Sequence, residues 1–153
     1  MTVRYKHTNV VARDWDRLAC FYENIFKCVR VPPERHISGS WLEEGTGVKD
    51  ARISGVHLRL PGVGRGGPTL EIFQYAHIEE GLPPKANRAG FSHIAFEVED
   101  VHEVINSVLE NGGSKIGQVT SCRIEGLGDL VFVYLADPEG NIIEVQEKMR
   151  TSS

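Results

Sequence analysis

The sequence predicts an α+β protein whose two paired βαβββ modules form a curved, cup-like, eight-stranded mixed sheet. The first observation is a repeated start. Two stretches that alternate apolar and polar residues, as strands do, each contain one His, and an Asp followed by a helical pattern comes seven positions later, at 7 to 14 and at 93 to 100. A start that recurs in this way indicates an internal repeat.

The second observation is a repeated end. Each half closes with a strand that holds one Glu among apolar residues, Glu71 in residues 69–73 and Glu144 in residues 142–146. We therefore expect one domain over residues 1–153, made of modules at about 3–76 and 90–148. The polar, Pro-bearing segment 77–89 is expected to join them.

The first module begins with an expected strand at 3–11. Asp14 is a good N-cap, and apolar residues at three-and-four spacing predict a helix that ends near Cys28. Prolines and glycines make residues 32–52 irregular, with a short strand expected around 36–41. Strands at 53–60 and 69–75 complete the module.

The second module repeats this order. A strand at 90–98 leads to Asp100, which caps a helix that ends at Gly112-Gly113. Strands are expected near 115–124 and 129–136, and the sequence Asp137-Pro138-Glu139-Gly140 predicts a turn before the last strand at 141–147.

The composition excludes several classes of partner. A formal net charge of −4 and a pI near 5.9 argue against nucleic acid or an anionic membrane surface. No apolar run approaches the ~20 residues that span a bilayer. The N-terminal residues lack an apolar signal core, and the three cysteines show no Cys-x-x-Cys spacing. We expect a cytoplasmic protein with no disulfide framework, in which Cys20 and Cys28 are ordinary buried or half-buried thiols.

The connector at 61–68 matches G-x-G-x-x-G at Gly62, Gly64 and Gly67. A dinucleotide site needs a helix N-terminus after this motif, but Pro68 and another strand follow. A hairpin loop is therefore favoured, and no nucleotide cofactor is expected.

Strand parity selects four candidate metal ligands. If the apolar residues of each strand pack under a helix, His7, Glu71, His93 and Glu144 all turn to the opposite, open face. Two imidazoles and two carboxylates suit a divalent transition metal with open positions for substrate. Taken singly, each residue is more often structural, but equivalent places in a repeat favour a shared site.

The remaining histidines have weaker claims. His36, His77 and His102 have no equivalents in the other module. His57 alternates with Val56 and Leu58, so it could face the same cavity as a substrate contact, although a solvated or hydrogen-bonded role is favoured.

The chain resembles the vicinal oxygen chelate superfamily, which includes glyoxalase I, methylmalonyl-CoA epimerase, extradiol dioxygenases, and bleomycin- or fosfomycin-resistance proteins. The similar segments are His7 to Phe26 with its Phe21-Tyr22 pair, Gly90 to Val101, and Asp137 to Glu144. The Leu-Gly that commonly closes the family's first helix is Phe26-Lys27 here. The resemblance places the metal ligands on His7, Glu71, His93 and Glu144, and the catalytic base on Glu144 or Glu71.

The function expected from this resemblance is that of a glyoxalase-like lyase, isomerase or epimerase. It would transfer a proton next to a carbonyl of a small-molecule substrate, with a divalent metal ion (Zn, Ni, Co, Mn or Fe) chelating vicinal oxygens. The alternatives are an iron-dependent extradiol-type dioxygenase and a non-catalytic antibiotic-binding resistance protein. Members of the family commonly pair, so a homodimer is expected.

Overall fold

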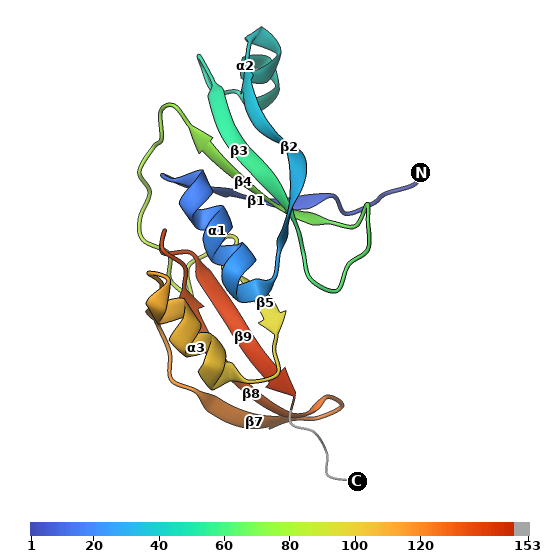
Figure 1. The fold of residues 1–153 in the computed structure, drawn as a ribbon, viewed down its shortest axis with the longest axis vertical. Helices are drawn as coiled ribbons and strands as arrows, with labels where there is room; N and C mark the ends of the chain where they lie inside the picture. Colours follow the sequence, from blue (N-terminus) through green and yellow to red (C-terminus); the bar gives the residue numbers. More distant parts are fainter. Residues whose placement is uncertain (149–153) are drawn as a thin grey trace. The chain divides into compact units, whose positions relative to one another are not determined.

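The computed structural model describes residues 1–148 and divides into two compact units, Met1–Gly81 and one that begins at Leu82. Each unit has its own mixed sheet, as the ribbon in Figure 1 shows. The α+β class is confirmed, and each unit begins strand-helix-strand as predicted; the first unit adds a second helix to the βαβββ order and the second unit adds a strand. In the described part of the chain, no helix is long and apolar enough to cross a membrane.

The first unit contains four strands and two helices. In chain order they are β1 (His7–Val11), α1 (Trp15–Phe26), β2 (Val29–Ser38), α2 (Ser40–Thr46), β3 (Arg52–Arg59) and β4 (Thr69–Tyr75). The sheet order is β1-β4-β3-β2, with β1 and β4 parallel and the other pairs antiparallel. This order places β4, which carries Glu71, between β1 and β3.

Helix α1 covers one face of this sheet. The Asp14 side chain accepts a hydrogen bond from the Arg17 N–H, as expected for an N-cap. Leu18 and Tyr22 are almost fully buried, as are Leu58 and Ile72 on the neighbouring strands. Packing between these apolar groups is the main favourable term in folding of the unit, because it removes their surface from water. The alternate residues of these strands, such as His57 and Glu71, therefore lie on the face of the sheet opposite α1.

Helix α2 covers one end of that other face. Its Leu42 is buried with Ala51 and Ile53, and a partly buried group packs against them: Ile37, Phe73 and Tyr75. Position 55 has no room for a side chain, which accounts for the glycine there. A Cβ at Gly55 would lie 2.1 Å from the Ile72 carbonyl oxygen and 2.7 Å from the Phe73 ring. The remainder of this face holds the polar residues described below.

The second unit contains five strands and one helix. They are β5 (His93–Glu97), α3 (Val101–Glu110), β6 (Ser114–Lys115), β7 (Thr120–Ile124), β8 (Gly128–Ala136) and β9 (Ile142–Lys148). The sheet order is β5-β9-β8-β6, and β7 also pairs with β8. Strand β9, which carries Glu144, thus lies between β5 and β8, as β4 lies between β1 and β3.

Helix α3 begins and ends where the sequence predicts. The Asp100 carboxylate accepts hydrogen bonds from the N–H groups of His102 and Glu103. Gly112, just after the helix, has a φ of 85°, the left-handed conformation that glycine adopts without strain. The predicted turn also forms, because the Gly140 N–H donates to the Asp137 carbonyl and the Asp137 side chain accepts from three further groups within Glu139–Asn141.

Two differences from the expected strands have clear causes. The described chain has nine strands rather than eight because residues 115–124 are interrupted: the N–H groups of Ile116 and Gly117 both donate to the Tyr134 carbonyl, which breaks the ladder there. Residues 29–38 form one long strand despite Pro32-Pro33, because β2 pairs on one side only and its register shifts at the prolines.

Candidate metal centre

Glu71 lies in the middle of the first sheet, between Asn9 on β1 and His57 on β3 in register. Asn9 Nδ2 donates to Glu71 Oε1 at 2.9 Å, and His57 Nε2 lies 2.6 Å from Glu71 Oε2. The Glu71 side chain is only 10% exposed. A buried carboxylate needs such partners, because burial without them would cost several kcal/mol.

His7 completes a cluster of three potential metal ligands. Its Nε2 lies 3.5 Å from Glu71 Oε1, and its ring meets the His57 ring edge-on with centroids 5.4 Å apart. One donor atom from each of His7, His57 and Glu71 lies within 4.8 Å of the other two. Two imidazoles and one carboxylate match the donor sets of catalytic zinc sites and of non-haem iron sites. The residues therefore fit a divalent metal ion.

The surroundings of His57 keep it neutral. Burial lowers the pKa of this imidazole below 6.5, against the opposing effect of the Glu71 carboxylate, and the neighbouring Arg35, His7 and Lys6 side chains lower it further. Because a carboxylate only accepts hydrogen bonds, Nε2–H of neutral His57 donates to Glu71, and Nδ1 accepts from the Thr69 hydroxyl at 2.9 Å. A metal ion at Nε2 would require the other neutral tautomer, in which Nδ1–H donates to the Thr69 hydroxyl and holds the ring in place.

The second unit holds a smaller cluster at the equivalent place. His93 Nε2 lies 2.9 Å from Glu144 Oε2, with side-chain exposures of 28% and 18%. The Tyr134 ring packs on His93 with centroids 4.9 Å apart. Burial raises the pKa of Tyr134, and the Glu144 carboxylate raises it further, so the phenol is neutral and able to donate.

The strand registers show that the two clusters are equivalent by repeat. His7 pairs with Thr69, two residues before Glu71, and His93 pairs with Ile142, two residues before Glu144. The neighbours of the two glutamates differ. Glu71 lies between Asn9 and His57, whereas Glu144 lies between Ala95 and Tyr134.

The structure therefore brings the predicted ligands together in pairs, His7 with Glu71 and His93 with Glu144, each pair inside its own unit. Sequence reasoning underrated His57 and missed Tyr134. A signal for His57 was present, since its parity on the strand at 53–60 matches that of the candidate face. Tyr134 had no such signal until the register of β8 against β9 was known.

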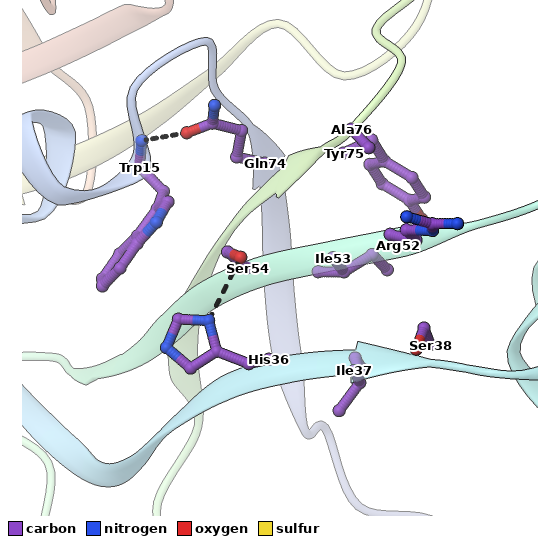
Figure 2. Close-up of a pocket in the computed structure, with 10 residues that line it drawn as sticks. All are labelled: Trp15, His36, Ile37, Ser38, Arg52, Ile53, Ser54, Gln74, Tyr75 and Ala76. Atoms are coloured by element: carbon purple, nitrogen blue, oxygen red, sulfur yellow. Dashed lines mark hydrogen bonds between the residues drawn. The ribbon is translucent and has the colours of Figure 1, made fainter.

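Two cavities open in the first unit. One, of about 600 Å³, is lined by His57, Thr69 and several basic side chains. The other, of about 380 Å³, contains none of His7, His57 and Glu71. Figure 2 shows its walls, where the Trp15 N–H donates to the Gln74 side chain at 3.3 Å and His36 Nδ1 lies 3.2 Å from the Ser54 hydroxyl. Of the three candidate metal ligands, His57 lines the larger cavity.

Comparison with known proteins finds a match to one protein family. A family model described as Glyoxalase/Bleomycin resistance protein/Dioxygenase superfamily matches residues 4–145. A comparison with curated protein sequences finds no match.

Solved structures share the fold at low sequence identity. A glyoxalase family protein from Bacillus cereus superposes with a TM-score of 0.81 at 19% identity, over 97% of this chain and 96% of that one. A family enzyme from Burkholderia phytofirmans PsJN gives 0.61 at 14% identity, over 96% and 100% of the two chains. The fosfomycin resistance protein FosX from Listeria monocytogenes, complexed with Mn(II) and sulfate ion, gives 0.54 at 13% identity, over 98% and 96%.

Proposed function

Because the chain belongs to the Glyoxalase/Bleomycin resistance protein/Dioxygenase superfamily, we propose that it is a metal-dependent lyase, isomerase or epimerase of the glyoxalase type. The observation that supports this most is the cluster of His7, His57 and Glu71, whose donor atoms lie within 4.8 Å of one another beside a cavity of about 600 Å³. That volume suits a small-molecule substrate. Mn(II) is the first metal to test, because the FosX structure was solved in complex with it.

His7, His57 and Glu71 would hold the metal in this proposal. When bound, the ion would act as a Lewis acid that polarises substrate oxygens and stabilises negative charge next to a carbonyl. The sequence predicts a four-residue set in which His93 and Glu144 bind the same ion. That part stays a prediction. Matched Gln variants at these two positions test it by metal affinity.

Glu144 is the better candidate for the base. Both oxygens of Glu71 already have partners, since Oε1 accepts from Asn9 and Oε2 contacts His57. Among residues 1–148, Glu144 makes a polar contact to His93 through Oε2; of its strand neighbours, Ala95 has no side-chain donor and the Tyr134 phenol forms no hydrogen bond to it. A carboxylate with an oxygen left over can accept a substrate proton, and it is also the more exposed of the two.

A specific observation also favours a second function. Two His and one carboxylate with open positions are the ligand set of non-haem Fe(II) oxygenases. The cluster of His7, His57 and Glu71 has this composition, so an iron-dependent dioxygenase is the second candidate. The third, a resistance protein that only binds its drug, needs no metal.

Metal analysis combined with solvent exchange separates the three candidates. The purified protein is loaded with Mn(II), Zn(II), Ni(II) or Fe(II), and α-hydroxy carbonyl compounds are incubated with it in heavy water. Metal-dependent uptake of deuterium next to the carbonyl is the expected result. Oxygen consumption with Fe(II) and no exchange would favour the dioxygenase instead. A protein that binds none of the metals contradicts both enzyme proposals.

Assembly and location complete the proposal. We propose a homodimer, because paired modules of this family commonly associate, and light scattering at micromolar concentration tests it: a monomer mass contradicts the proposal. A cytoplasmic location agrees with the three cysteines, which are all free thiols.

A further inference from the structure

The larger cavity of the first unit has an unusual charge. Its lining contains basic side chains at five positions and no Asp or Glu; the basic residues are Lys6, Arg30, Arg35, Arg59 and Arg65. The whole chain, by contrast, has a formal net charge of −4. Like charges gathered around one space repel each other, so such an arrangement is costly unless an anion enters.

One of the five, Arg30, already has compensating charge. Its guanidinium pairs with Asp16 at 2.7 Å and with Glu23 at 2.9 Å, and it lies over the Trp15 ring. Arg30 therefore serves to hold β2 against α1. It is not counted among the groups available to a ligand.

The other four remain uncompensated. Among residues 1–148, none of Lys6, Arg59 and Arg65 forms an ion pair with a carboxylate. The Arg35 guanidinium donates to the Pro33 carbonyl, a neutral partner that leaves its charge in place. Guanidinium groups with free donors bind phosphate and carboxylate oxygens in pairs of hydrogen bonds.

The uncompensated basic residues lie close to the candidate metal ligand His57. Arg59 pairs with Thr69 and His57 pairs with Glu71, so Arg59 lies two residues along β3 from the candidate metal ligand His57, on the same face. Two residues of a strand span roughly 6.5–7 Å. Arg65, Gly66 and Gly67 come from the connector after β3, so this glycine-rich segment forms part of the cavity wall.

We propose that this cavity binds a multiply charged oxyanion group of the substrate, a phosphate, phosphonate or pair of carboxylates, through Lys6, Arg35, Arg59 and Arg65. This inference rests on the proposed function, because it assigns the part of the substrate that lies away from the metal ligands. On this assignment the anionic group of the substrate lies beside Arg59, two residues along β3 from the candidate metal ligand His57.

Isothermal titration with inorganic phosphate tests the site in the full-length protein, in a buffer free of other oxyanions. The double variant Arg59→Gln/Arg65→Gln should weaken phosphate binding at least about tenfold. Arg17→Gln, which removes an exposed charge of α1, is the matched control and should change nothing. Added KCl should weaken binding to the native protein, since screening reduces attraction between exposed charges. Circular dichroism verifies that the variants are folded.

Two further measurements identify the group and separate this inference from the proposed function. Methylphosphonate and succinate, titrated in the same way, show whether phosphoryl or paired carboxyl groups bind better. Mn(II) is titrated separately. Phosphate binding that depends on Arg59 and Arg65 in a protein that binds no Mn(II) supports the anion site and contradicts the proposed function. Mn(II) binding with no affinity for any of the three anions, or equal affinity in the double variant, overturns the anion site alone.

Discussion

His57 Nε2 lies 2.6 Å from Glu71 Oε2, across the antiparallel pairing of β3 and β4 that sets the two residues opposite each other. This contact makes His57 a candidate ligand of equal standing with His7. We predict that His57→Gln lowers Mn(II) affinity by at least about 10–100-fold, because loss of even an orienting neighbour of a ligand has that effect. Titration calorimetry measures the change.

The control for this prediction is His102→Gln. His102 is exposed in the first turn of α3, and its side chain has no part in either cluster. Its replacement should leave Mn(II) affinity within the error of the measurement. Equal affinity of the native protein and the His57 variant would contradict any role of His57 in the metal centre.

The two glutamates should respond differently to the same substitution. Glu144→Gln keeps a coordinating oxygen but cannot accept a proton, so we predict that deuterium exchange falls by about 10²–10⁴-fold while Mn(II) remains bound. Glu71→Gln should weaken Mn(II) binding more than Glu144→Gln does, because it disturbs the contact to His57. If exchange survives in Glu144→Gln and is lost in Glu71→Gln at saturating metal, the base is Glu71.

Gly55 is a position where any side chain meets backbone. Its added Cβ would lie 2.1 Å from the Ile72 carbonyl oxygen, which β-sheet pairing holds in place. We predict that Gly55→Ala destabilises the protein by about 1–3 kcal/mol or more, as expected for overpacking. Gly45→Ala in α2 is the contrast: nothing lies within 4 Å of its added Cβ, so a gain of up to about 1 kcal/mol in stability is expected from helix propensity. Differential scanning calorimetry should show Tm shifts of opposite sign.

Cys28 should be unreactive in the folded protein. Its side chain is buried, and burial, with a smaller contribution from Glu23, raises the pKa of the thiol from 9.0 to about 12. The thiolate is the reactive form, so a thiol reagent at pH 8 should modify only the exposed Cys20 and Cys122. Cys28 should react after unfolding in guanidinium. Fast modification of all three thiols in the native protein would contradict the buried position of Cys28.

The same shift predicts a dependence of stability on alkaline pH. The folded state keeps the Cys28 proton where the unfolded chain loses it, so this contribution to stability is complete below about pH 9 and disappears as the pH rises to about 12. Chemical unfolding across this range should show a smaller decline for Cys28→Ala than for the native protein. Cys122→Ala, at an exposed position, should follow the native curve.

Strand parity and caps could be predicted because they depend on neighbouring residues. Asp14 and Asp100 cap their helices, and Glu71 and Glu144 lie on strands whose adjacent residues are buried. Residues 29–52 could not be predicted, because the long strand β2 and helix α2 are stabilised by distant partners, β3 and the Leu42 cluster. Cys20 was expected to be at least half-buried but is exposed. His57 was underrated for a related reason, since its contact to Glu71 depends on a strand register that short-range patterns do not determine.

The register also shows how far the two duplicated halves have diverged. Tyr134 lies opposite Glu144 as His57 lies opposite Glu71. One half therefore offers three metal donors and the other two, and the difference lies in a single side chain. Tyr134→His would place an imidazole opposite Glu144, as His57 lies opposite Glu71, and so give each unit two imidazoles and one carboxylate.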